Sequence, residues 1–155
     1  CAVLDTRKTI PGLRRAQKYA VLIGGGQNQR LALWHGILIK ENHIAAAGGI
    51  KAAMQAAINL NSGVDIQIEV EDLNELKEAL QAGAKNILID NFTTNQMREA
   101  VAITQGAALL EASGGVNLEQ LRGIAETGVD RISIGKLTKD VIAVDFSLRI
   151  QSITA

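Results

Sequence analysis

Scarce residue types exclude several classes of protein before any motif is considered. The chain has one cysteine, Cys1, which rules out an internal disulfide framework and is consistent with a reducing, cytoplasmic setting. One cysteine and two histidines are too few to assemble a zinc site. Aromatic residues make up 3% of the chain, so the stacking platforms of single-stranded nucleic-acid binders are missing. No signal peptide and no apolar run of about 20 residues is found, so we expect no contact with a membrane.

The charges balance, which excludes another group of partners. Sixteen Lys and Arg residues face sixteen Asp and Glu residues, so no overall basic field favours nucleic acid. An anion site must therefore arise from a local concentration of cations. The composition, 47% hydrophobic and 21% charged, suits one globular domain, which we place over residues 1–155. Because the chain begins with Cys-Ala-Val and not with Met, we expect it to be a segment of a longer protein.

Short apolar runs alternate with stretches of helical period along most of the chain. We predict strands at residues 2–4, 20–23, 37–39, 65–70, 86–89, 107–110 and 131–134, with a later one near 144–150. Helices are predicted over residues 48–59, 72–81, 94–104 and 117–126, where apolar residues recur three and four positions apart. Asp72 and Thr94 are expected at helix starts, and Gly83 and Gly128 at left-handed helix ends.

The spacing of these elements predicts a parallel sheet. From Ile66 to Ile132 one strand follows another about every 22 residues, close to the minimum for a strand, a helix and two short loops. Strands that are apolar throughout and alternate with helices indicate a parallel sheet covered by helices. This leaves two architectures, a (β/α) barrel and an open doubly wound sheet.

Polar residues at the ends of the predicted strands favour the barrel. They occupy positions 5–8, 27–30, 40–43, 69, 71, 90–91, 111–113 and 136–138. An open sheet gathers its ligand groups at one switch point, whereas a barrel draws them from the carboxyl ends of many strands. We therefore predict an α/β fold of the (β/α) barrel type, TIM-like and possibly incomplete.

The side chains expected to meet at this rim favour a polyanionic ligand. Arg7, Lys8, Arg30 and Lys40 outnumber the acidic residues there, so a polyanion with a divalent cation is the expected ligand. The glycines at positions 114, 115 and 135 permit close backbone approach, and helix starts offer free N–H groups to phosphate. Barrels often bind phosphate after their last two strands.

Seven segments together resemble the quinolinate phosphoribosyltransferase family, also called nicotinate-nucleotide pyrophosphorylase (carboxylating). The segments are LDTRKTIPGLR, GGGQNQR, LIKENH, IEVE, LIDN, EASGG and TGVDRISIGKLT, in the family's order from Val3 to about Leu148. The resemblance implies a pentosyltransferase of NAD biosynthesis. Such an enzyme joins quinolinate to phosphoribosyl pyrophosphate with Mg²⁺ and releases pyrophosphate, CO₂ and nicotinate mononucleotide. It also implies a C-terminal barrel domain without the family's N-terminal α+β domain, and a cytoplasmic homodimer with a shared active site.

The same resemblance implies roles for the cations. Arg7, Lys8 and Arg30 resemble the residues that hold the two quinolinate carboxylates. Lys40 resembles a catalytic lysine that reaches toward both substrates. These roles agree with the chemistry, because a planar guanidinium binds a carboxylate through two parallel hydrogen bonds and a lysine acts as a point charge.

It also implies roles for acidic and small residues. Glu69 and Asp90 resemble the catalytic carboxylates near the ribose hydroxyls and the Mg²⁺ ion. On adjacent strands they could stabilise an oxocarbenium-like ribose or hold the metal. The residues that resemble the 5′-phosphate cradle are Ser113, Gly114, Gly115 and Gly135.

Three positions depart from the family's pattern. Gln29, a neutral donor, stands where the family usually has histidine, and His35 stands where it usually has an acidic residue. Lys136 replaces a small residue beside the phosphate loop. Such changes bear on substrate affinity more than on the fold.

Two other functions remain open. The chain could be a catalytically silent or truncated barrel fragment that binds anions or self-associates. It could also be a related pyrophosphorylase that uses another small anionic acceptor, which the altered residues Gln29 and His35 would permit. Calorimetric titration discriminates the first of these from the enzyme, since a silent fragment would bind both substrates without turnover.

Overall fold

The computed structural model describes residues 1–151, and these form a parallel six-stranded sheet with helices around it. The strands are β1 (Ala2–Leu4), β2 (Ile37–Ile39), β3 (Ile66–Val70), β4 (Asn86–Asp90), β5 (Leu109–Ser113) and β6 (Arg131–Ser133). They pair in the order β1-β6-β5-β4-β3-β2. Within this part of the chain no ladder joins β1 to β2, and a single bridge pairs Leu4 with Gln27. The predicted incomplete barrel is thus confirmed.

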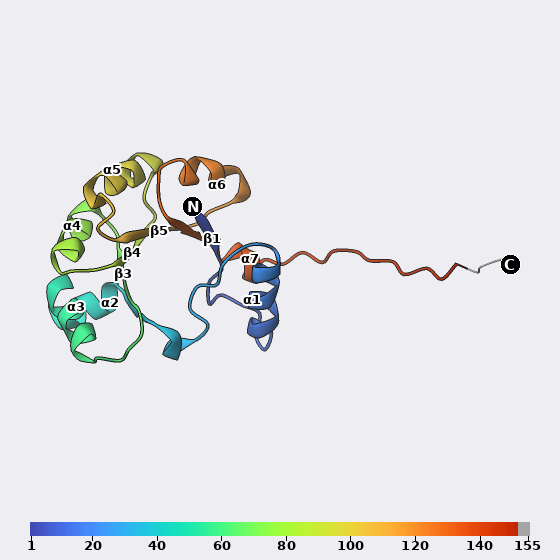
Figure 1. Ribbon diagram of the computed structural model, residues 1–155, viewed down its shortest axis with the longest axis horizontal. Helices are drawn as coiled ribbons and strands as arrows, with labels where there is room; N and C mark the ends of the chain where they lie inside the picture. Colours follow the sequence, from blue (N-terminus) through green and yellow to red (C-terminus); the bar gives the residue numbers. More distant parts are fainter. Residues whose placement is uncertain (152–155) are drawn as a thin grey trace.

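The helices cover the outside of the curved sheet. They are α1 (Arg14–Ile23), α2 (Glu41–Ala47), α3 (Ile50–Asn59), α4 (Leu73–Gln81), α5 (Thr94–Thr104), α6 (Leu118–Ala125) and α7 (Lys136–Lys139), with a 3-10 turn at Leu33–His35. Figure 1 shows α3, α4, α5 and α6 following one another around the sheet, and α1 beside α7. No helix in residues 1–151 is both long enough and apolar enough to span a bilayer.

The hydrophobic core lies between the sheet and these helices. Ile68, Ile87, Ile89 and Ile132 are fully buried and belong to one cluster with the helical residue Leu76. Strand side chains alternate between the two faces of the sheet, so their neighbours point the other way, into the barrel. Most of those inward positions hold polar side chains, namely Gln67, Glu69, Asn86, Asp90, Glu111, Ser113, Arg131 and Ser133, and the others include Leu4, Leu38 and Leu88. The barrel interior is therefore mostly polar, unlike the layers of Val, Ile and Leu that fill most such barrels.

The predicted capping residues are found at the helix ends, except that the cap of one helix lies one residue earlier than predicted. The Asp72 carboxylate accepts hydrogen bonds from the backbone N–H groups of Asn74 and Glu75, at 2.7 and 2.9 Å, and so caps α4 as predicted. The cap of α5 is Thr93, not Thr94, because Gln96 completes a capping box with Thr93. Glycines 83 and 128 have φ of +85° and +95°, which confirms the predicted left-handed helix ends.

The predicted strand at residues 20–23 is wrong, because these residues form the last turns of α1. A four-residue apolar run cannot distinguish a strand from a segment of helix. The residues of α1 that contact the body are spaced at helical intervals. Gln17 donates to the Thr138 carbonyl, Lys18 to the Asp5 carboxylate, and Val21 lies against Gly26.

The predicted strand near residues 144–150 is also absent from the structure. Figure 1 shows the chain leaving the body after α7 as an extended segment. Val144, Phe146, Leu148 and Ile150 are 72 to 96% exposed and have no strand beside them. The alternating pattern fits a strand, but a strand needs a partner to complete its hydrogen bonds. Other predicted boundaries moved by one or two residues, and the largest shift was at 107–110, which became β5 from Leu109 to Ser113.

Candidate active site

A lysine and a glutamate form the centre of the candidate site. Lys40 directly follows β2 and Glu69 lies in β3, the neighbouring strand. The Lys40 Nζ lies 2.9 Å from Glu69 Oε1. Burial works against the charge of Lys40, but the hydrogen bond and charge of Glu69, helped by Glu41 and Asp90, raise the pKa of Lys40 above its ordinary value. Lys40 therefore stays protonated at neutral pH and offers a cation rather than a base.

A second carboxylate comes from the next strand. Asp90 ends β4, which pairs with β3, so Glu69 and Asp90 approach the same rim from adjacent strands, as predicted. The Asp90 carboxylate accepts a hydrogen bond of 2.8 Å from the Asn91 side chain. Among residues 1–151 no group of three or more His, Cys, Asp or Glu side chains is placed to hold a metal ion. Two carboxylates nevertheless suit Mg²⁺, which commonly binds one or two of them together with substrate oxygens.

Two arginines lie close enough for the charge of one to act on the other, and Glu69 also acts on one of them. Burial, followed by the positive charge of Arg7, lowers the pKa of Arg30, while Glu111 and Glu69 oppose this shift. The Arg30 guanidinium donates one hydrogen bond of 3.3 Å to the Gly36 carbonyl. The Nε–H of Arg7 is the single buried side-chain polar group in the described chain that has no hydrogen-bond partner. Like charges with an unpartnered donor are suited to receive an anion.

Beside these charges lies a polar cavity of about 330 Å³. The predicted cradle residues Ser113, Gly114, Gly115 and Gly135 all line it, together with Lys8. Asp90 also lines it, and the charge of Asp90 is one of those that act on Lys40. Lys136 and Lys139, which follow Gly135 in α7, add two further cations.

Two of the glycines lie close to neighbouring loops, and one of them is required by fixed backbone. Gly114 has φ of +109°, and a Cβ there would lie 2.8 Å from the backbone nitrogen of Asn91. A Cβ on Gly135 would lie 3.2 Å from the Cδ of Lys8. The missing side chains thus allow the loop after β5 to approach the loop after β4, and the loop after β6 to approach the segment after β1.

We expect Gly114→Ala to remove phosphate binding and to lower the stability by about 1–3 kcal/mol, because the new methyl group meets fixed backbone at a strained φ. Calorimetric titration with inorganic phosphate and thermal unfolding would measure both effects. Gly123→Ala is the matched control, since Gly123 lies in α6 with nothing within 4 Å of its added Cβ. The control should bind phosphate normally and be equally or slightly more stable. Normal phosphate binding by the Gly114 variant would contradict this account of the loop.

A buried ion pair supports the cationic side of the site. Asp5 and Lys18 are 0% and 2% exposed, and their charged atoms lie 2.6 Å apart. Asp5 also accepts hydrogen bonds of 2.7 Å from the Asn28 side chain and from the Gln29 backbone N–H. The sequence predicts Asp5 among the polar residues of the rim, and this prediction is wrong because the Asp5 carboxylate is fully enclosed. The carboxylate instead fixes the segment that leads to Arg30.

The structure brings all ten predicted site residues to one end of the barrel. Arg7, Arg30, Lys40 and Glu69 form the charged side, and Lys8 lies with the four small residues at the phosphate-sized cavity. Asp90 belongs to both parts. The functional roles of these residues stay predictions.

Several residues of the site were missed. Lys139 lines the cavity, and Gln67 and Glu111 point inward from β3 and β5 below the rim. The signal for the last two was the alternation of polar and apolar residues within IQIEV and LLEAS. For Lys139 it was the positive charge in the turn after Gly135.

The fold and the site together define a class of protein: an incomplete parallel α/β barrel that presents clustered cations and a glycine-lined anion cavity at the carboxyl ends of its strands. The sequence model of the quinolinate phosphoribosyl transferase C-terminal domain matches residues 1–149. The chain belongs to this family, and its fold is that of the family's C-terminal domain.

Individual relatives agree with this assignment. The probable nicotinate-nucleotide pyrophosphorylase (carboxylating) of Bacillus subtilis is 46% identical over 150 residues, which are 94% of this chain and 51% of that protein. The chloroplastic nicotinate-nucleotide pyrophosphorylase (carboxylating) of Arabidopsis thaliana is 40% identical, over 97% of this chain and 49% of that protein. The solved nicotinate-nucleotide pyrophosphorylase of Francisella tularensis superposes with a TM-score of 0.93 at 48% identity, over 97% of this chain and 54% of that one. The chain thus spans about half the length of the curated relatives it matches.

Proposed function

We propose that this chain supplies the substrate-binding face of a quinolinate phosphoribosyltransferase, which forms nicotinate mononucleotide, CO₂ and pyrophosphate from quinolinate and phosphoribosyl pyrophosphate. One observation carries the proposal. The paired guanidiniums of Arg7 and Arg30, with one buried N–H unpartnered, lie next to the Lys40–Glu69 pair, and Asp90 connects that pair to the phosphate-sized cavity. A dicarboxylate and a sugar phosphate would thereby be held side by side.

The cations would bind the acceptor. Quinolinate carries two negative charges, and each guanidinium can donate two hydrogen bonds to one carboxylate. Lys40, whose Nζ lies 2.9 Å from Glu69 and on which the charge of Asp90 acts, would contact both substrates. Holding the pyridine nitrogen close to the anomeric carbon is itself a large part of the catalysis.

The carboxylates would act on the ribose. When the pyridine nitrogen attacks the anomeric carbon and pyrophosphate leaves, the ribose acquires positive charge, which Glu69 and Asp90 can stabilise. The carboxylate at C2 then leaves as CO₂, the electron pair of the broken bond stays on C2 where the adjacent pyridinium charge stabilises it, and C2 takes a proton from water. No residue pair of the described site is needed as a general acid and base for these steps.

We assign Mg²⁺ binding to Glu69 and Asp90, with the remaining ligands supplied by the pyrophosphate and ribose oxygens. The donor set fits, because both side chains offer carboxylate oxygens at one rim. Bound there, the ion would neutralise charge on the departing pyrophosphate.

A second copy of the chain is the proposed partner. Apolar side chains are exposed on α1 and on the turn that follows it: Tyr19, Leu22, Ile23, Leu33 and Trp34 are 51 to 76% exposed. Exposed apolar patches of this kind are typical of surfaces that another protein covers. This supports the homodimer implied by the resemblance. The low cysteine content is our reason to place the protein in the cytoplasm.

The test uses this chain fused behind the amino-terminal half of the Bacillus subtilis relative. We expect the fusion to release nicotinate mononucleotide and CO₂ from quinolinate and phosphoribosyl pyrophosphate, and a chelator to stop the reaction until Mg²⁺ is restored. The chain alone should bind both substrates by calorimetry. A folded fusion that binds both but never turns over would identify a silent barrel. Binding of neither substrate would overturn the proposal.

A further inference from the structure

A layer of three polar side chains crosses the barrel interior beneath the paired arginines. We call it the amide layer; it consists of Gln29, Gln67 and Glu111. The Glu111 carboxylate is 1% exposed and accepts hydrogen bonds from the Gln29 amide at 3.0 Å to both oxygens and from the Gln67 amide at 2.9 Å. The Gln29 amide also donates to Gln67 Oε1 at 2.9 Å.

The layer continues directly into Arg30. Gln29 Oε1 accepts the backbone N–H of Arg30 at 2.6 Å, so one Gln29 side chain joins the buried carboxylate of Glu111 to the backbone of Arg30. An amide whose two N–H donors are both engaged cannot rotate without breaking these bonds. The orientation of Gln29, and with it the local path of the chain at Arg30, thus depends on an acceptor at position 111.

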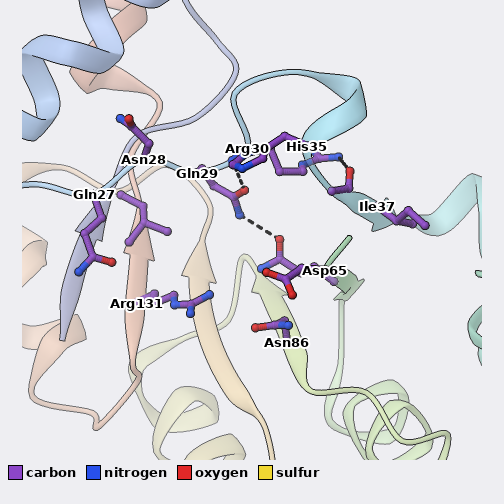
Figure 2. A pocket seen from close by; sticks show the side chains of 12 residues that line it. Gln27, Asn28, Gln29, Arg30, His35, Ile37, Asp65, Asn86 and Arg131 are labelled. Carbon is purple, nitrogen blue, oxygen red and sulfur yellow. Dashed lines mark hydrogen bonds between the residues drawn. The ribbon is translucent and has the colours of Figure 1, made fainter. Parts of the chain in front are cut away.

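The surroundings of Gln29 leave it room to move. Figure 2 shows Gln29 pointing into a cavity between the bridge at Gln27 and β2, with Asp65, Asn86 and Arg131 around it. This cavity measures about 220 Å³. Packing alone therefore does not fix the Gln29 side chain, whereas most interior side chains are held by close contacts. Hydrogen bonds must hold it.

A buried carboxylate whose hydrogen-bond partners are neutral amides lowers the stability of the fold, which indicates that this one has a function. Both direct donors to Glu111 are neutral, and neutral hydrogen bonds compensate a buried charge less well than an ionic partner does. Two positive charges neighbour Glu111: Arg131, which stands opposite it on β6, and Arg30, whose charged form Glu111 favours. The carboxylate is thus placed where it supports both the position and the charge of Arg30.

We propose that Glu111, acting through the Gln29 amide, is a positioning residue that holds Arg30 beside Arg7 so that the two guanidiniums can bind a dicarboxylate. This inference rests on the proposed function, which it deepens by naming a determinant of selectivity for two carboxylates over one. It assigns no direct contact between Glu111 and the substrate.

The test is the isosteric change Glu111→Gln, measured by calorimetry on this chain. One oxygen acceptor becomes an amide donor that faces the Gln29 amide, so Gln29 turns away from position 111 and releases Arg30. We expect quinolinate to bind about tenfold more weakly, a loss of about 1.4 kcal/mol. The affinity for pyridine-3-carboxylate, with one carboxylate, and for inorganic phosphate should change less than twofold. If Glu111 acted only through its charge, removing it would make the site more cationic and quinolinate would bind more tightly.

A double variant separates positioning from general structural damage. Combining Gln29→Glu with Glu111→Gln exchanges the carboxylate and the amide across the layer, and position 29 keeps an acceptor for the Arg30 N–H. We expect the double variant to recover quinolinate binding to within about threefold of the original, as coupled neighbours do in a mutant cycle. Thr104→Val is the control for lost stability, since Thr104 is buried with one hydrogen bond to Ala100 and is remote from the site.

The outcomes are distinct. Unchanged or tighter quinolinate binding by a folded Glu111→Gln variant overturns the inference, as does equal weakening of quinolinate and phosphate. If Glu111→Gln does not fold, failure of the folded double variant to bind quinolinate overturns it. Should the unaltered chain bind neither quinolinate nor phosphoribosyl pyrophosphate, the proposed function itself fails, and the layer has no role in selectivity.

Discussion

Lys40→Ala is expected to lower kcat/KM of the fusion protein by about a thousandfold, the upper range for removing one preorganised charge from an active site. The change removes the cation that lies 2.9 Å from Glu69 and leaves that carboxylate, with Asp90, unneutralised beside an anionic acceptor. Both the lost attraction and the new repulsion act on quinolinate. Steady-state formation of nicotinate mononucleotide, with thermal unfolding to show that the variant is folded, gives the measurement.

Two companion variants make this result interpretable. Lys85→Ala removes a lysine that contacts only the Ala107 carbonyl, at 3.4 Å, and should leave kcat/KM within about twofold. Adding Glu69→Gln to Lys40→Ala removes the unneutralised carboxylate and should recover quinolinate binding without restoring turnover. A folded Lys40→Ala fusion with normal turnover would show that the role implied for Lys40 is wrong.

The charge of Lys40 should also be insensitive to pH over the neutral range. Its pKa is raised by Glu69 despite burial, so the lysine loses its proton only above the ordinary pKa of the group. The stabilisation that the protonated lysine contributes is complete below that value and is lost as the pH rises through the raised one. Any loss of activity between neutral and mildly alkaline pH therefore has another source.

The fold was predictable because the regular elements repeat. From β3 to β5 each strand is followed by a helix whose apolar residues recur at helical intervals and whose first residue is preceded by a capping side chain, such as Asp72 before α4. The repeat fixes parallel pairing, and parallel pairing brings the polar residues that follow each strand to one rim. Arg7, Lys40 and Asp90 could therefore be placed together without coordinates.

The two strands that were predicted wrongly have different physical causes. Residues 20–23 form an apolar run that is too short to distinguish a helix from a strand by its period. In addition, α1 is held to the rest of the protein by hydrogen bonds of Gln17 and Lys18, which the sequence pattern does not predict. Residues 144–150 have the alternation of a strand, but strand formation depends on a partner, and none is present in residues 1–151.

The polar barrel interior was missed because the strands were interpreted as uniformly buried. Gln67, Glu69 and Glu111 interrupt otherwise apolar strands at every second position, which predicts one polar and one apolar face. What the alternation cannot predict is which amide meets which carboxylate. The bond from Gln29 to Glu111 joins residues 82 positions apart and depends on how the loop before Arg30 enters the barrel.

The loop before Arg30 is held by Asp5, and replacing Asp5 is expected to have the largest effect on stability. Asp5→Asn should lower the free energy of unfolding by about 3–5 kcal/mol, the usual cost of removing one partner from a buried ion pair. Asp5 and Lys18 are almost completely enclosed, so Lys18 would be left as an uncompensated charge with only the Gln29 carbonyl, at 3.0 Å, to accept from it. The total free energy of unfolding of a small domain is about 5–15 kcal/mol, so the variant would lose a large share of its stability.

Urea unfolding of the chain, followed by circular dichroism, measures this change. The matched control is Glu126→Gln, which removes a carboxylate whose contact with Arg122 is 3.9 Å long and exposed. Exposed pairs of this kind contribute from about 0 to 1 kcal/mol, so the control should unfold almost normally. Equal midpoints for Asp5→Asn and Glu126→Gln would show that the buried pair does not stabilise the fold.

Replacing both partners distinguishes the ion pair from the hydrogen bonds around it. A buried ion pair can often be exchanged for apolar residues at little cost, but Asp5 also accepts from Asn28 and from the Gln29 backbone, both at 2.7 Å. In Asp5→Leu with Lys18→Met these two donors lose their acceptor, and buried donors without partners cost about 1–3 kcal/mol each. We therefore expect the double variant to remain destabilised and to bind quinolinate weakly, because the segment before Arg30 is no longer held. A double variant as stable as the original would show that the ion pair alone accounts for the contribution of Asp5 to stability.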